Sequence, residues 1–117
     1  MPQINISVAK KLSDNTKDAL QMALADNISI LPGKTKEKLA VCIIDDCSMY
    51  KNAQPSNGAF IEVRLFRNTT EQAKREFTGL LFDIANRILE IHQDQIYINY
   101  IELQDWGAGG IYKATSA

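Results

Sequence analysis

The sequence predicts an α+β fold in which duplicated β-α-β units form a four-stranded mixed sheet with two helices on one face. Four short segments have the alternating or continuous apolar patterns of β-strands, and a helical stripe separates the members of each pair. The turn-forming stretch KNAQPSNG, residues 51–58, divides the chain into two similarly patterned halves. We therefore expect a single domain over residues 1–117, with internal repeats at about 2–50 and 58–104.

The first unit reads as strand, helix and strand. Apolar residues alternate with polar ones over residues 4–8, which predicts a half-buried strand. Ser13 is a candidate N-cap, and apolar residues then recur at helical spacing from 20 to 31, where Pro32-Gly33 is expected to end the helix. The apolar run LAVCII, residues 39–44, predicts a buried strand.

The second unit repeats this plan. Residues 59–66, AFIEVRLF, alternate as a strand does, and Asn68 and Glu71 have the spacing of a capping box. An apolar stripe from 77 to 91 predicts a helix, and IYINYIEL, residues 96–103, predicts the closing strand. A crossover through one helix makes the two strands of each unit parallel.

One face of this sheet has no predicted helix to cover it. That face carries residues such as Phe60 and Phe66, and an apolar surface left open in a chain of this size favours association. The pattern therefore predicts an oligomer, for which closed symmetry is the usual solution.

Composition excludes several classes of function. Thirteen lysines and arginines against 14 aspartates and glutamates give a net charge of −1, so the chain lacks the excess of positive charge that binds nucleic acid or an anionic membrane. No apolar run reaches the roughly 18 residues that span a bilayer, and the N-terminus lacks signal-peptide features, so a cytoplasmic location is expected. Cys42 and Cys47 are spaced unlike a redox or zinc motif, and we expect reduced thiols and no metal site.

Proline at position 2 has two interpretations. A proline is tolerated at the first position of a strand because its missing N–H is not needed there. Alternatively, removal of Met1 would leave the Pro2 nitrogen as a free secondary amine that can take up a proton. A base that moves a proton between carbon and oxygen needs a pKa near the working pH. Burial or a nearby ammonium would lower the pKa of a terminal amine from its usual value of about 7.7–8.0.

The chain resembles the macrophage migration inhibitory factor branch of the tautomerase superfamily. The resemblance covers nearly the whole chain and is carried by Met1-Pro2, by Gly33-Lys34 and above all by YINY at residues 97–100. It implies a homotrimer whose sheets surround a central channel, with active sites between subunits. It also implies keto–enol tautomerisation of phenylpyruvate-like aromatic α-keto acids, with no cofactor.

The resemblance assigns a role to six residues. Pro2 would be the catalytic base, and Lys34 would hold the substrate carboxylate with help from the backbone near Phe66. Tyr97 and Asn99 would reach into the substrate site from the neighbouring subunit, and Trp106 would form part of its apolar rim.

Two departures from the family pattern leave alternatives open. The usual Phe-Gly-Gly-Ser turn reads KNAQ here, and the C-terminal pattern is replaced by residues 109–113, GGIYK. They favour a rival hypothesis, a non-catalytic cytokine-like trimer that binds a protein or small ligand. Arg64 and Arg67 leave room for the hydrolytic or dehalogenase chemistry that superfamily relatives perform with a proline and arginines.

Overall fold

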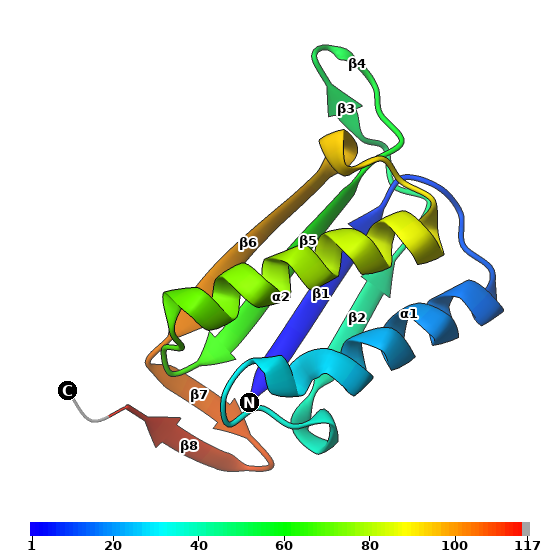
Figure 1. Ribbon diagram of the computed structural model, residues 1–117. Helices are drawn as coiled ribbons and strands as arrows, with labels where there is room; N and C mark the ends of the chain where they lie inside the picture. The colour runs from blue at the N-terminus through cyan, green and yellow to red at the C-terminus, as the bar shows by residue number, and fades with distance from the viewer. Residues whose placement is uncertain (116–117) are drawn as a thin grey trace.

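The computed structural model describes residues 1–115, and its main elements are two helices that lie on one side of a β-sheet. In chain order, the helices and strands are β1 Pro2–Val8, α1 Asp14–Asn27, β2 Ala40–Ile44, β3 Tyr50–Lys51, β4 Gln54–Pro55, β5 Ala59–Phe66, α2 Glu71–Ile84, β6 Ile96–Leu103, β7 Asp105–Ala108 and β8 Ile111–Ala114 (Figure 1).

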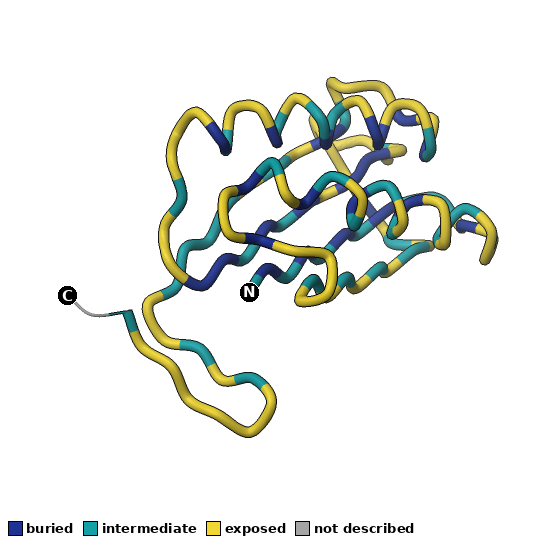
Figure 2. Tube along the Cα trace, turned by 60° about the horizontal axis from the view of Figure 1, so that its bottom comes forward, coloured by how far each residue is buried: buried dark blue, intermediate teal, exposed yellow. Residues whose placement is uncertain are grey.

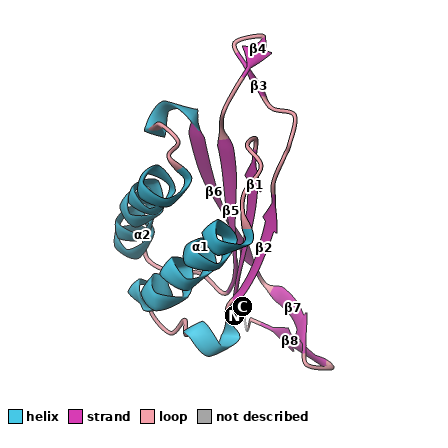
Figure 3. Ribbon diagram, turned by 90° about the vertical axis from the view of Figure 1, so that its right-hand side faces the viewer, coloured by secondary structure: helices cyan, strands magenta, loops and turns pink. Residues whose placement is uncertain are grey.

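The four-stranded sheet has the order β2-β1-β5-β6. β1 is parallel to β2, β5 is parallel to β6, and the two units meet through the antiparallel pair β1–β5. Both helices cover the same face, and the other face is left open (Figure 3). The predicted α+β fold with two β-α-β units is therefore confirmed.

The core lies between the helices and this covered face. Alternate residues of β1 and β5 are buried, as the two-residue period of a strand requires (Figure 2). Phe77 of α2 is fully buried and is the largest such side chain. The principal side chains that pack with it are Ile4, Ile6, Leu20, Leu24, Ile28, Leu31, Ile61, Leu65, Leu81, Ile84 and Leu89.

The first helix begins as predicted and ends earlier than predicted. The Ser13 hydroxyl accepts a hydrogen bond from the Thr16 backbone N–H at 3.1 Å, so Ser13 is the N-cap. The α-helix ends at Asn27, and residues Ile28–Ile30 form a 3₁₀ turn before Pro32 is reached. The Asn27 side chain donates to the Ala23 carbonyl at 2.8 Å, a local bond that competes with continuation of the helix.

The predicted N-cap of the second helix is wrong. Thr70, not Asn68, caps α2, and its hydroxyl accepts from the Ala73 backbone N–H at 3.1 Å. Arg67 has a φ of 74°, which turns the chain sharply after β5 and leaves Asn68 in the loop. Asn68 has the capping-box spacing to Glu71, but it lies two residues before the observed N-cap, Thr70.

Replacing Thr70 with alanine is expected to lower the free energy of unfolding by about 1 kcal/mol, because the Ala73 N–H loses its acceptor. The adjacent Thr69 is a matched control, since its buried hydroxyl has no hydrogen-bond partner within residues 1–115. Thr69→Val should therefore leave stability unchanged or raise it. Urea unfolding of both variants checks this, and equal losses would contradict the assignment of the cap.

The strand expected to be buried, β2, is instead an edge strand. Its residues alternate between exposed and half-buried, with Val41 and Ile43 packed against the core. Cys42 lies on the exposed side, and both Cys42 and Cys47 are free thiols. An apolar run alone did not reveal that β2 has a neighbouring strand on only one side.

The open face is less apolar than the sequence led us to expect. Its centre is a polar chain in which Gln3 donates to Asn5 at 3.1 Å, and Asn5 and Arg64 donate to the Glu62 carboxylate at 3.2 and 3.1 Å. Phe60 is 47% exposed on this face, as expected, whereas Phe66 is only 5% exposed. The Trp106 ring of β7 lies beside Phe66, with the ring centres 6.1 Å apart, and helps to cover it.

Two small hairpins extend from opposite ends of the sheet (Figures 1 and 3). β3–β4 begins at Tyr50 and otherwise lies within residues 51–58, which were predicted only as turns, and β7–β8 was not predicted at all. β8 is exposed along its whole length, so it carries no alternating burial pattern. Over residues 1–115, no helix combines the length and apolar character that crossing a membrane requires.

Candidate active site

The amino terminus lies at one end of the sheet, between β2 and β5. Pro2 is buried and opposes Leu65 across the antiparallel pair, and the Phe66 backbone N–H donates to the Met1 carbonyl at 3.3 Å. Pro2 begins β1, where the missing N–H of proline costs little. The strand pairing thus holds the terminal residues beside the end of β5.

Lys34 brings a buried positive charge to the same place. Its side chain reaches from the loop before β2 and donates to the Phe66 carbonyl at 2.8 Å, and the residue is only 9% exposed. Gly33 precedes it with a φ of 77°, a left-handed conformation that glycine adopts without strain. An ammonium group has three donors, of which the Phe66 carbonyl takes one.

The environment of the terminus favours a neutral amine. Burial, followed by the Lys34 ammonium, lowers the pKa of the Met1 amine from 8.0 to about 6, with smaller effects from Lys38 and Lys113. Each cause disfavours the protonated form, either by removing water or by adding a like charge. An amine held in this place is mostly unprotonated at pH 7 and can act as a base.

Two aromatic side chains, Phe66 and Trp106, lie together at the end of β5. The Phe66 ring lies 6.1 Å from the Trp106 ring of β7, and the Arg67 guanidinium lies 5.3 Å from the Phe66 ring centre. Pro2, Lys34, Phe66 and Trp106 are therefore linked by strand pairing, hydrogen bonding or ring contact. Trp106 could be assigned to this place only once the β7–β8 hairpin was known.

Tyr97 and Asn99 lie elsewhere on the same chain. Tyr97 opposes Phe60, which opposes Ser7, so Tyr97 is about 17 Å along the strands from Pro2. Its ring packs on Phe60 at 5.7 Å, and it is 44% exposed on the open face. Asn99 is exposed on that face as well. Within one chain, the structure does not bring either residue to the Pro2 site.

The two arginines of the alternative chemistry are engaged in other contacts. Arg64 pairs with Glu62 at 3.1 Å near the middle of the open face, and Arg67 stacks on Phe66. Nowhere in the described part of the chain do three or more His, Cys, Asp and Glu side chains gather as a metal site would require.

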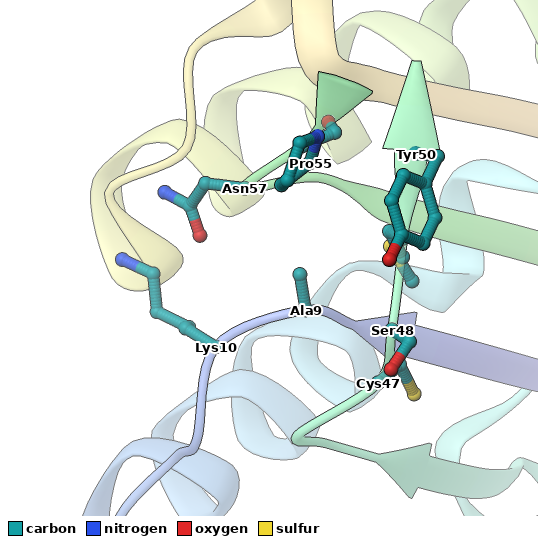
Figure 4. Close-up of a pocket in the computed structure, with 9 residues that line it drawn as sticks. Ala9, Lys10, Cys47, Ser48, Tyr50, Pro55 and Asn57 are labelled. Carbon is teal, nitrogen blue, oxygen red and sulfur yellow. The ribbon is translucent and has the colours of Figure 1, made fainter. Parts of the chain in front are cut away.

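A surface cleft of about 500 Å³ lies at the opposite end of β1, away from Pro2. Lys10 and Asn57 lie on one side of it, Tyr50, Ser48 and Cys47 lie on the other, and Ala9 lies between them (Figure 4). The Lys10 ammonium donates to the Leu89 carbonyl at 2.6 Å, and this cleft contains none of Pro2, Lys34, Phe66 and Trp106. We therefore assign the candidate active site to the amino terminus and not to this cleft.

Solved structures share this fold across most of their length. The chain is 17% identical to Leishmania major MIF2 over 96% of this chain and 97% of that chain, with a TM-score of 0.89. It is 16% identical to Pt0534 inactivated by 2-oxo-3-pentynoate, covering 92% and 93% of the two chains at a TM-score of 0.83. It is 18% identical to an R7 fused 4-OT solved as an asymmetric trimer, covering 93% and 94% at 0.79.

Sequence comparison defines the class and then the family. Two β-α-β units on one sheet, with both helices on one face, define the fold class that the chain shares with these structures. Residues 1–114 match the family described as macrophage migration inhibitory factor (MIF), and the chain belongs to that family. A search of curated protein sequences finds no match. The resemblance inferred from Met1-Pro2, Gly33-Lys34 and YINY is confirmed.

Proposed function

We propose that the protein is a keto–enol tautomerase for phenylpyruvate-like aromatic α-keto acids, with the Pro2 amine as general base after removal of Met1. The observation that carries the proposal is the position of the chain terminus beside Lys34, where burial and that lysine lower the pKa of the Met1 amine to about 6. Without Met1, the Pro2 nitrogen becomes the terminal amine beside the same lysine and the same strand end.

The neighbouring groups suit the reaction. In the enolisation direction, the neutral Pro2 nitrogen takes a proton from C3 of the keto acid, and the electron pair moves to the C2 oxygen. That oxygen takes a proton from water to give the enol, and the Pro2 ammonium returns its proton to solvent, which restores the neutral amine. Removal of Met1 also frees the Phe66 N–H from the Met1 carbonyl. That N–H and the Lys34 ammonium can then hold the substrate carboxylate. Phe66 and Trp106 supply the aromatic surface for the ring.

The proposal includes a homotrimer in which Tyr97 and Asn99 complete the site of a neighbouring subunit. Both side chains are exposed on the open face and are available to a second chain. The Asn99 amide could donate to the substrate carbonyl oxygen there. The asymmetric trimer of the fused 4-OT supports this arrangement, as does the exposure of Phe60 beside Tyr97.

Ultraviolet-monitored tautomerisation of phenylpyruvate tests the proposal. Protein whose intact mass shows that Met1 is absent should turn over phenylpyruvate, and protein that retains Met1 should not, because its Pro2 nitrogen is an amide. Covalent modification by 2-oxo-3-pentynoate, which inactivates Pt0534, should map to Pro2 only in the processed protein. Equal turnover by both forms would refute Pro2 as the base.

Lys34→Met should raise the pKa of the terminal amine and weaken substrate binding. The change removes the second-largest cause of the lowered pKa but leaves burial, so the pKa should rise above 6 and stay below 8.0. NMR titration of the amine in protein that carries Met1 measures this without requiring activity. In processed protein, kcat/KM for phenylpyruvate should fall about tenfold or more, since a charged hydrogen bond is lost.

Lys36→Met is the matched control for Lys34→Met. Lys36 lies in the same loop but is exposed, and it is not among the groups that lower the pKa of the terminal amine. The control should change neither the titration nor the kinetics. If Lys34→Met leaves the amine pKa at about 6, the role given to Lys34 is wrong.

The rival function is a non-catalytic trimer that binds a protein or small ligand. One observation favours it for any chain that keeps Met1: the Met1 carbonyl occupies the Phe66 N–H that the tautomerase would use for substrate. The β3–β4 hairpin, which departs from the family pattern, adds a surface that a ligand could contact. Absence of turnover in fully processed, trimeric protein would favour this rival.

A further inference from the structure

Two exposed lysines join Lys34 around the amino terminus, each delivered by a different segment. The parallel register pairs Gln3 with Ala40, and Lys38 ends a 3₁₀ turn two residues before Ala40, so this turn lies at the Met1 end of β1. Lys113 opposes Trp106 in the β7–β8 hairpin, and Trp106 contacts the Phe66 ring. The segment before β2 and the C-terminal hairpin therefore each bring a lysine to this end of the sheet.

Within residues 1–115, no carboxylate pairs with these charges. In the part of the chain that the structure describes, Lys34, Lys38 and Lys113 form no ion pair. Asp105 lies on the same hairpin as Lys113, but its carboxylate accepts from the Tyr112 hydroxyl at 2.7 Å. Directly opposed residues share a face of an antiparallel pair, so Trp106 and Lys113 lie on one face and Asp105 and Tyr112 on the other.

The three lysines also act together on the terminal amine. Burial contributes most to the lowered pKa of the Met1 amine, the Lys34 ammonium comes next, and Lys38 and Lys113 add to it. This effect is consistent with the chain path, which brings the segments that carry Lys34, Lys38 and Lys113 to the Met1 end of the sheet. A cluster of unpaired cations in a chain of net charge −1 marks a place for an anion.

We infer that the preferred substrate is a dianionic α-keto acid, in which Lys34 binds the carboxylate next to the ketone and Lys38 and Lys113 bind a second carboxylate at the far end. The inference rests on the proposed function and narrows its substrate class. Phenylpyruvate has only one carboxylate, which would bind Lys34 and leave Lys38 and Lys113 without an anionic partner. Lys38 and Lys113 are specificity residues and do not take part in proton transfer.

The first test compares two substrates that differ by one carboxylate, phenylpyruvate and 4-carboxyphenylpyruvate, on processed protein at low ionic strength. We expect kcat/KM to be about tenfold higher for the diacid, mainly through KM, which is the factor that two partly exposed charge pairs supply. The preference should decrease with added salt, since exposed charges are screened.

Variants separate the two lysines from the general charge of the loop. In K38Q/K113Q the ratio of kcat/KM between the two substrates should fall to about one. Both substrates are compared on the same variant, so any effect of the substitutions on the pKa of the terminal amine changes both kcat/KM values equally and leaves their ratio unchanged. K36Q removes one charge from the same loop and should keep the tenfold ratio. A ratio near one in the unmodified protein, or a ratio that survives K38Q/K113Q, would overturn the inference.

A binding measurement keeps the inference testable if the protein proves not to be a tautomerase. Calorimetric titration with cinnamate and 4-carboxycinnamate, which do not undergo the reaction, should give about tenfold tighter binding of the diacid, abolished in K38Q/K113Q. Such binding without turnover of either keto acid would refute the tautomerase and keep the dianion site. Equal binding of the two acids would refute the site, whatever the turnover.

Discussion

Replacing Pro2 with glycine is expected to lower kcat/KM for phenylpyruvate by well over tenfold, within the roughly 10²–10⁴-fold range that a general base contributes. Glycine keeps a terminal amine after Met1 removal but loses the ring that is buried at the start of β1. The amine becomes primary and more mobile, so it is less well held against Lys34 and Phe66. The effect should appear mainly in kcat, because the groups proposed to hold the carboxylate are unchanged.

The pH dependence of the same reaction provides an independent check. The base works only when it is neutral, so kcat/KM should rise with pH and level off above the pKa of the amine. In the chain that carries Met1, burial and Lys34 lower the pKa of the terminal amine from 8.0 to about 6. The same two causes should lower the pKa of the Pro2 amine, so the rise should be centred below the 8.0 of an unshifted terminal amine. A rise centred near 8.0 would contradict the environment described for the terminus.

The matched control for Pro2→Gly is Pro55→Gly. Pro55 is exposed in the β3–β4 hairpin, at the other end of the sheet from Pro2. It should leave turnover within about twofold of the unmodified protein, since exposed substitutions have small effects. Intact mass must show that Met1 is absent from every sample. Unchanged turnover in processed Pro2→Gly would remove proline from the mechanism.

Replacing Phe77 with alanine is expected to lower the free energy of unfolding by about 3–5 kcal/mol, the usual cost of deleting a buried aromatic ring. Phe77 has no exposed surface and packs where α2 faces the sheet, between residues of both units. Its removal leaves a cavity that helices and sheet cannot close without losing other contacts. Phe77→Leu should cost much less, because most of the volume is kept.

Phe60→Ala is the control for loss of a ring as such. Phe60 is 47% exposed on the open face, so its removal should cost less than the removal of Phe77. Urea unfolding should be done at one fixed protein concentration, because association would add to apparent stability. If Phe60→Ala destabilises the protein as much as Phe77→Ala, the core is not centred where the structure has it.

Much of the sheet could be predicted because its signal is local. The alternation over residues 59–66 and the pattern of 96–103 match β5 and β6 at both ends. The covered face also follows from alternation, since Ile61 and Val63 are buried while Glu62 and Arg64 lie on the open side. A two-residue period is a property of neighbouring residues, so it survives without knowledge of the rest of the fold.

Helix ends and edges were predicted less well because they depend on single contacts. Asn68 and Thr70 are both suitable N-caps by residue type, and the sharp turn at Arg67 decides between them. The apolar run of β2 is also typical of a central, buried strand, and only the strand order shows that β2 is an edge strand. The β7–β8 hairpin has little apolar periodicity, and Gly109-Gly110 was its one available turn signal.

By itself, the sequence determined the two β-α-β units and the family, and it led to the hypothesis that Pro2 and Lys34 form the site, because periodicity and motifs are read along the chain. Only the tertiary structure decided which groups surround the amino terminus. The bond from Lys34 to the Phe66 carbonyl joins residues 32 positions apart, and Lys113 reaches the site only through a hairpin that lies against the end of β5. Burial and like charge lower the pKa of an amine only when distant segments meet around it, and no local pattern records that meeting.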